Sequence, residues 1–332
     1  MPGNGISGVG RNSLWGATAT GRAPTGRGPV VDGPVARPRT SAAGSASAPD
    51  HVVAAGVGAP VVVPALPALP AGVPLALDPS APAGPNELMV ASYNIENLFD
   101  TEKDPNPELK DDQFTPSGDY KWTEAKLKRK LAHLGQAIRA LNGGQGPDIL
   151  ALNEVENAAV VARLRDEALA DLGYGPVVHL DTEDKRGIDN AILSRHPLIG
   201  EPVLHTVHVP GHPLWKDQKT RGILEATFDV GGVPLTVFVN HWPAMDYSER
   251  KKQREHVGQQ LRALIEAKQA ADPSAEIMVL GDFNASPGEA SFGPSGLGAS
   301  GDPEVVKKKQ LPLYDTVACL ADQLRAAKGQ AP

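Results

Sequence analysis

Four short motifs place side chains that could bind a metal and a phosphate directly after apolar runs. They are Tyr93-Asn94-Ile95-Glu96, Leu152-Asn153-Glu154, Asn240-His241-Trp242-Pro243 and Gly281-Asp282-Phe283-Asn284. Their carboxylates are hard oxygen ligands of the kind that Mg²⁺ prefers, their amides are neutral donors, and His241 is a titrating group. Hydrolysis of a phosphate ester needs these roles: charge neutralisation, activation of a water, and donors to the phosphoryl oxygens.

Each motif alone is a weak signal, because Asn and Asp at the end of a strand commonly open a turn. Here the four motifs follow four different predicted strands, separated by predicted helices and a hairpin. Strand ends of this kind can meet at one edge of a sheet. Their joint presence therefore favours a catalytic site over four unrelated turns.

The elements that must position these side chains alternate between strand and helix periodicity from Leu88 onward, which indicates a mixed α/β class. Two helices are predicted, one after a possible N-cap at Thr123 and one over residues 248–270. Gly231-Gly232 predicts a tight hairpin, because two glycines allow the positive φ angles of its turn. Strands are expected over residues 88–95, 148–153, 190–194, 222–230, 233–240 and 276–281.

Composition divides the 332 residues near residue 86. Residues 1–86 are rich in Gly, Ala, Pro, Val and Ser and are expected to be a disordered leader. Prolines interrupt the apolar stretch over residues 52–77, so it fits neither a secretory signal nor a membrane span, and a mis-assigned start codon explains the leader equally well. Localisation stays open.

Charge and cysteine content exclude two further classes. The formal net charge of −7 argues against a broadly basic nucleic-acid surface, although local arginines and a bound cation could still attract phosphates. The single cysteine, Cys319, excludes an intrachain disulfide framework. His179, His205, His208 and His212 lack the spacing of a compact zinc site and are expected to be ordinary loop and strand residues.

On the four motifs, the chain resembles the endonuclease/exonuclease/phosphatase superfamily over about residues 88–320. The resemblance implies a four-layered α/β sandwich, with two central mixed sheets flanked by helices, formed by residues 87–332. It also implies a metal site at one edge, for Mg²⁺ with Mn²⁺ or Ca²⁺ as alternatives. Glu154 matches the family's principal metal ligand, Asn94 supports the metal shell or phosphate, and Glu96 joins that shell less directly.

The other motifs carry over the roles around the phosphate. Asp282 would orient or deprotonate the water, and Asn284 would donate to the scissile phosphate or to Asp282. Asn240 would hold a phosphoryl oxygen, and His241 would contact the phosphate or assist the leaving group. We expect Asp189 to be the acidic partner of His241.

Several further residues have competing interpretations. Arg221 is a candidate phosphate ligand or an exposed arginine beside a strand. The basic cluster Arg250, Lys251, Lys252 and Arg254 is read first as a solvated helix face, and second as a phosphate-facing patch. Trp122 and Trp215 could line a substrate cleft, but packing aromatics are the more common case.

The carboxyl end departs from the family pattern. Relatives complete the site with a last segment, commonly an Asp-His pair before a final strand, whereas no histidine follows Asn284 here. We therefore expect a domain that lacks its C-terminal catalytic segment.

The function favoured by the sequence is divalent-metal-dependent hydrolysis of phosphodiester bonds, with a nuclease as the first choice. The alternatives are a phosphatase or phosphodiesterase acting on a small or lipid phosphoester, and a truncated remnant that binds phosphates without turnover. The expected partner is nucleic acid or another phosphoester substrate, without a membrane span, and the chain is expected to be a monomer.

Overall fold

The computed structural model describes residues 15–20, 80, 82–84, 87–207, 221–245, 250–286, 288–301, 305 and 313–314. The strands are β1 (Trp15–Thr20), β2 (Glu87–Leu98), β3 (Ile149–Val155), β4 (Val178–His179), β5 (Asp189–Ser194), β6 (Leu198–His205), β7 (Ile223–Val230), β8 (Val233–His241), β9 (Glu276–Asp282), β10 (Ala299–Ser300) and β11 (Leu313–Tyr314). The helices are α1 (Glu124–Arg139), α2 (Ala158–Arg163), which continues into the π-helical turn Leu164–Ala168, and α3 (Arg250–Ala271). Short 3₁₀ turns cover Asp112–Phe114, Asn142–Gly144 and Ala170–Leu172.

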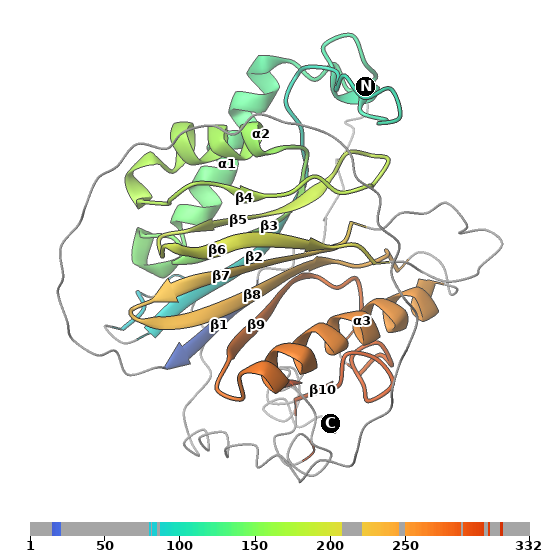
Figure 1. Cartoon of the computed structure of the whole chain (residues 1–332). Helices are drawn as coiled ribbons and strands as arrows, with labels where there is room; N and C mark the ends of the chain where they lie inside the picture. The colour runs from blue at the N-terminus through green and yellow to red at the C-terminus, as the bar shows by residue number, and fades with distance from the viewer. Residues whose placement is uncertain are drawn as a thin grey trace, which may run out of the picture. The chain divides into compact units, whose positions relative to one another are not determined.

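Two mixed sheets form the centre of the domain. The first has the order β1-β2-β3-β5-β4 and the second has the order β6-β7-β8-β9. The parallel pairs that matter for the site are β2 with β3 and β8 with β9. Helices α1 and α2 lie on the outer side of the first sheet and α3 on the outer side of the second (Figure 1). The predicted four-layered α/β sandwich is confirmed.

Three apolar cores hold these layers together. The central core joins Val90, Ile149 and Ile192 of the first sheet to Val237 and Leu280 of the second. The two outer cores bury the helices against their sheets. Because β3, β5 and β8 are covered on both faces, they consist largely of buried side chains.

Most predicted elements are present with shifts of a few residues. In α1 the apolar side chains at helical spacing, Leu127, Leu131, Leu134 and Ile138, are buried as expected, although the Thr123 side chain makes no capping hydrogen bond. The hairpin at Gly231-Gly232 is also confirmed, because Val230 pairs with Val233 and both glycines have positive φ. Strand β6 and helix α2 were not predicted.

Other expectations fall partly outside the described residues, namely those for residues 315–332, His208, His212, Trp215 and most of residues 1–86. Within that last stretch the structure places β1 antiparallel to β2 at the edge of the first sheet. No helix in the described ranges is both long enough and apolar enough to cross a membrane.

The basic residues at the start of α3 differ in their exposure. Lys251 and Lys252 are exposed, as a solvated face predicts. Arg254 is instead only 1% exposed and pairs with Glu289 through Nε and Nη2. The prediction was wrong for Arg254, because helical spacing turns this position toward the loop that carries Glu289.

Candidate active site

The four motif ends meet at one edge of the sandwich. Asn94 lies opposite Asn153 in the parallel β2–β3 ladder, so Glu154 follows beside it. His241 lies opposite Asp282 in the parallel β8–β9 ladder. Strand β9 contacts both β2 and β3 across the gap between the sheets, and this brings the two pairs together.

The Asn94 amide joins the two carboxylates. Its Nδ2 donates to Glu154 Oε1 at 3.1 Å and to Asp282 Oδ2 at 2.9 Å. His241 Nε2 lies 3.7 Å from the same oxygen of Glu154 and 3.9 Å from Asp282 Oδ2. Four residues from four strands therefore surround one small region.

The backbone is unusual at these strand ends. Non-glycine residues with positive φ include Glu96 at 54°, Asn97 at 62°, Glu154 at 64° and Asn284 at 45°. The β2–β3 register shifts between Asn94 and Leu98, and the β3–β5 register shifts at Glu154. Bulges of this type turn a side chain away from its regular direction, and such strain is concentrated at functional sites.

Asp282 and Asn284 are held by main-chain groups. The Asn284 N–H donates to Asp282 Oδ1 at 2.9 Å, so both oxygens of Asp282 accept a hydrogen bond. The Asn284 side-chain amide donates to the Trp242 carbonyl at 3.0 Å. Asn284 thus orients Asp282 through its backbone, while its side chain bonds to the carbonyl of Trp242, the residue that follows β8.

His241 is a buried and neutral imidazole. Its side chain is 3% exposed. Burial lowers the pKa of His241 well below its ordinary value, and the positive charges of Arg221 and Arg186 lower it further. Its Nδ1 is buried without a hydrogen-bond partner among the described residues.

Arg221 lies within the electrostatic reach of the site. Its Nε is 3.2 Å from Asp184 Oδ2, and its Nη1 donates to the Trp242 carbonyl at 3.4 Å. Burial lowers the pKa of Arg221, while the charges of Asp184, Glu154 and Asp282 act in the opposite direction. The sequence offered no signal for Asp184, which fixes the guanidinium.

Asn240 lies beneath the site rather than in it. It is fully buried, its Nδ2 donates to the carbonyls of Phe238 and Leu280, and its Oδ1 accepts from Trp242 Nε1 at 3.1 Å. The Asn240 amide was predicted to hold a phosphoryl oxygen, but in the structure its groups are already engaged in these hydrogen bonds. The structure therefore gives Asn240 the geometry of a support between β8 and β9.

Asp189 is not placed against His241. One of its oxygens accepts from the N–H and hydroxyl of Thr182, and the other lies 3.2 Å from His179 Nε2. No hydrogen bond or ion pair joins it to His241 in the part of the chain that the structure describes. Instead, Glu154 and Asp282 are the carboxylates next to His241.

A buried amide network under the site was missed by sequence analysis. Asn153 Nδ2 donates to Asn190 Oδ1 at 2.7 Å and to the Asn240 carbonyl at 2.9 Å. Asn190 Nδ2 in turn donates to the Val239 carbonyl at 3.3 Å. These bonds cross from the first sheet to the second, so they fix the separation of the strand ends that carry the site.

The two carboxylates have the chemistry that a divalent cation prefers. Glu154 and Asp282 are 15% and 23% exposed, and within the described ranges neither forms an ion pair with a lysine or an arginine. Two converging carboxylates without a cation leave concentrated negative charge, which oxygen-preferring ions neutralise. Asn94 already touches both, whereas the exposed Glu96 contributes its N–H to Asn94 Oδ1.

A second group could also hold a cation. His179, Asp181 and Asp189 have ligand atoms that all lie within 4.8 Å of one another. His179 was expected to be an ordinary strand residue, because the spacing of the histidines matches no compact zinc site.

Comparison with known proteins decides the family. The sequence model of the Endonuclease/Exonuclease/phosphatase family matches residues 89–328. The chain belongs to this family. The resemblance read from the four motifs is confirmed, and the family consists of phosphoester hydrolases. A search of curated proteins found no match.

Solved structures of similar fold include three from different organisms. TDP2 from C. elegans is 16% identical, with 61% of this chain and 49% of that chain covered and a TM-score of 0.40. Sphingomyelinase C from Streptomyces griseocarneus is 23% identical, with 52% and 66% covered and a TM-score of 0.36. A β-hairpin deletion mutant of beta toxin from Staphylococcus aureus is 16% identical, with 64% and 75% covered and a TM-score of 0.42. The chain spans about half the length of the TDP2 structure.

Glu156, two residues beyond the family's glutamate, is buried in acidic surroundings. Its Oε2 accepts from the Asp100 N–H at 2.7 Å and from Asn157 Nδ2 at 3.2 Å. Burial raises the pKa of Glu156 to about 8, and the charges of Asp100, Asp111 and Asp104 add to the effect. The folded protein therefore holds this proton more tightly than the unfolded chain does.

We predict that Glu156→Gln stabilises the fold at alkaline pH. The stability linked to this proton is complete below the unfolded pKa of 4.5 and is lost as the pH rises through about 8. Glutamine keeps the acceptor but cannot ionise, so urea unfolding at pH 9 should show a gain of about 2 to 4 kcal/mol and at pH 5 almost none. Glu289→Gln is the control: it breaks the pair with Arg254 and should destabilise at pH 9. Equal effects of Glu156→Gln at both pH values would contradict the prediction.

Proposed function

We propose that this chain is a divalent-metal-dependent phosphodiesterase with nucleic acid as its substrate. The observation that carries the proposal is the convergence of Glu154 and Asp282 on the Asn94 amide, beside a neutral His241. Glu154 would hold Mg²⁺, Mn²⁺ or Ca²⁺, with Asn94 and the nearby Glu96 in support. A bound cation of this type neutralises charge that develops on the phosphoryl oxygens.

The remaining residues serve the attacking water and the phosphate. Asp282, whose orientation is fixed by Asn94 and Asn284, accepts a proton from the water as its oxygen bonds to phosphorus. The ester P–O bond breaks, and the leaving alkoxide takes up a proton from solvent. Neutral His241 and the guanidinium of Arg221 supply donors to the phosphoryl oxygens. In this proposal Asn240 and Asp189 act as supports, for β8 and for the segment with Thr182, respectively.

A small or lipid phosphoester is the second candidate substrate. The formal net charge of −7 favours it, because an acidic protein repels a long polyanion more than it repels a compact ester. The basic groove described below acts in the opposite direction, at the position where substrate would extend from the site.

Metal removal tests the proposal. Purified protein is assayed in parallel on plasmid DNA, RNA and bis-p-nitrophenyl phosphate, with EDTA and after addition of Mg²⁺, Mn²⁺ or Ca²⁺. We expect turnover to be lost in EDTA and restored by at least one of the ions, with cleavage of a nucleic acid among the activities. Turnover of the small ester alone would assign the second candidate. No turnover of any substrate with any ion would leave a protein that binds phosphates without catalysis.

A further inference from the structure

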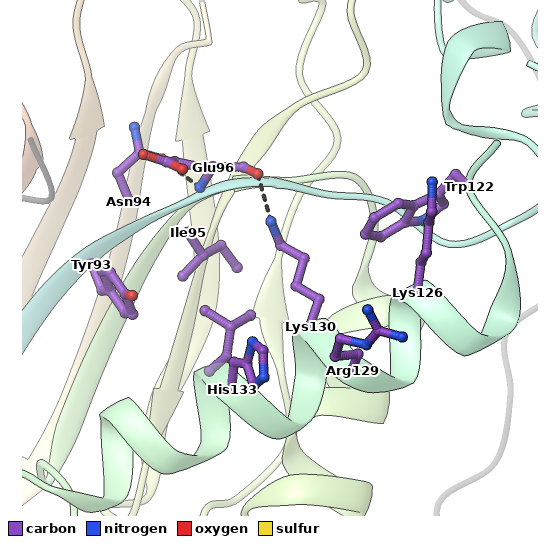
Figure 2. A pocket seen from close by; sticks show the side chains of 10 residues that line it. Tyr93, Asn94, Ile95, Glu96, Trp122, Lys126, Arg129, Lys130 and His133 are labelled. Atoms are coloured by element: carbon purple, nitrogen blue, oxygen red, sulfur yellow. Dashed lines mark hydrogen bonds between the residues drawn. The ribbon is translucent and has the colours of Figure 1, made fainter. Parts of the chain in front are cut away.

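A groove runs from the active site along helix α1. It lies between β2 and α1, has a volume of about 380 Å³, and has Asn94 and Glu96 in its lining. Figure 2 shows these two residues at one end and Trp122 and Lys126 at the other. Glu154, His241 and Asp282 are not among the lining residues, and the link to them is Asn94, whose amide contacts both carboxylates.

The helix side of the groove is basic. Lys126, Arg129, Lys130 and His133 line it, at the i, i+3, i+4 and i+7 positions that share one face of a helix. At 1.5 Å per residue this row is roughly 10 Å long. A row of this length can contact a few consecutive phosphates of a single strand. This local charge contrasts with the net charge of the chain.

The cations inside the groove differ from those outside it. Within the described ranges, Lys126, Arg129 and Lys130 form no ion pair with a carboxylate. Other cations on the same helix are paired: Lys128 with Glu124 and Arg139 with Asp171. The lysines that face the groove donate instead to main-chain carbonyls, Lys126 Nζ to that of Tyr120 at 2.6 Å.

Lys130 connects the groove to the catalytic residues. Its Nζ donates to the Glu96 carbonyl at 2.7 Å, and Figure 2 shows the side chain reaching from α1 toward β2. Burial lowers the pKa of Lys130, against the influence of Glu96 and Glu154. Lys130 thus lies next to the strand end that carries Asn94 and Glu96.

Aromatic side chains complete the groove. Trp122 is half-buried, its Nε1 donates to the Phe99 carbonyl at 3.0 Å, and its ring stands at 84° to the ring of Phe114. These contacts fix the indole at the far end of the row, while Tyr93 lies in the groove wall. A positive groove that combines backbone contacts with aromatic stacking is the chemistry that binds single-stranded nucleic acid.

We propose that this groove, defined by Lys126, Arg129, Lys130, His133 and Trp122, binds the single strand of DNA or RNA that flanks the scissile phosphate. The cations contact the next two or three phosphates, and Trp122 stacks on a base. The groove rests on the proposed function, because it extends the substrate of that same site. In this proposal the groove makes the enzyme prefer a single-stranded nucleic acid over a small phosphoester.

Binding tests the groove without requiring turnover. The full chain with Asp282→Asn is titrated against a fluorescein-labelled 12-nucleotide single strand, by anisotropy, at several salt concentrations. We expect the added pair Lys126→Gln and Arg129→Gln to weaken binding about 10-fold and to lower the slope of log K against log salt by about 1.4, for two lost phosphate contacts. Lys128→Gln, on the same helix but outside the groove, should bind like its parent.

Kinetics separate failure of the groove from failure of the catalytic proposal. With Asp282 intact, the double variant should keep kcat/KM for bis-p-nitrophenyl phosphate within about 2-fold and lose about 10-fold on the oligonucleotide. If no substrate is cleaved, the proposed function fails, but the binding assay still tests whether the groove binds the oligonucleotide. Unchanged oligonucleotide binding by the double variant, an equal loss in Lys128→Gln, or binding to anionic phospholipid vesicles in place of the oligonucleotide would each overturn the groove.

Discussion

Replacement of Asp282 by asparagine is expected to lower kcat for phosphodiester hydrolysis by about 10² to 10⁴-fold, the usual cost of losing a general base. Both Asp282 oxygens accept a hydrogen bond, one from Asn94 Nδ2 and one from the Asn284 N–H. An asparagine must turn its own NH₂ toward one of these donors, so it loses the orientation as well as the charge. The measurement is steady-state hydrolysis of bis-p-nitrophenyl phosphate and an oligonucleotide at saturating metal.

Asp148→Asn is the matched control. Asp148 is 21% exposed, close to the 23% of Asp282, and its two oxygens accept from the Met89 N–H and from Arg195. It precedes β3, at the end opposite Glu154, so asparagine here should reduce stability and leave kcat within about 3-fold. Similar kcat losses in both variants would show that Asp282 matters for folding rather than for the reaction.

The edge that holds the site could be predicted because strand periodicity and polar strand ends are local signals. The apolar runs before Asn94, Glu154, His241 and Asp282 each formed a strand, as expected from their composition. Parallel pairing of β8 with β9 then places His241 beside Asp282. These steps need only the sequence and the geometry of a sheet.

The partners of the buried polar groups could not be predicted in the same way. Strand β8 is buried on both faces from Leu235 to His241, so alternation does not tell which way the Asn240 amide points. Asp189 takes His179 and Thr182 as partners because β4 pairs with β5, a contact that no local pattern announces. Arg254 pairs with Glu289 for a similar reason, 35 residues away in the chain.

The groove could not be predicted either, because it too depends on contacts between residues that are far apart in the chain. The basic residues of α1 are visible in the sequence at helical spacing, but which of them are neutralised depends on side chains of other elements. Asp171, which pairs with Arg139, belongs to the turn after α2, an element that was not predicted. Only the packed structure shows which of these cations have a carboxylate partner and which do not.

Gly281→Ala is expected to lower the free energy of unfolding by about 2 to 5 kcal/mol and kcat by about 10²-fold. Gly281 has a φ of +129°, which side-chain-bearing residues rarely adopt, and it lies opposite Asn240 in the β8–β9 ladder. A Cβ at this position would lie 2.0 Å from the Asn240 carbonyl oxygen and 2.7 Å from its nitrogen. The strands must separate to admit it.

The two losses are linked because the next pair in this ladder is His241 with Asp282. Separation of β8 from β9 at Gly281 therefore moves the proposed general base relative to the imidazole, and misplacement by about 1 Å is enough to cost 10²-fold in rate. Gly293→Ala is the control, since its Cβ would meet nothing closer than 3.6 Å. Urea unfolding and kcat are measured for both variants. A Gly281→Ala protein as stable as Gly293→Ala would show that the strands close without glycine, whereas a destabilised but fully active one would show that catalysis does not depend on this register.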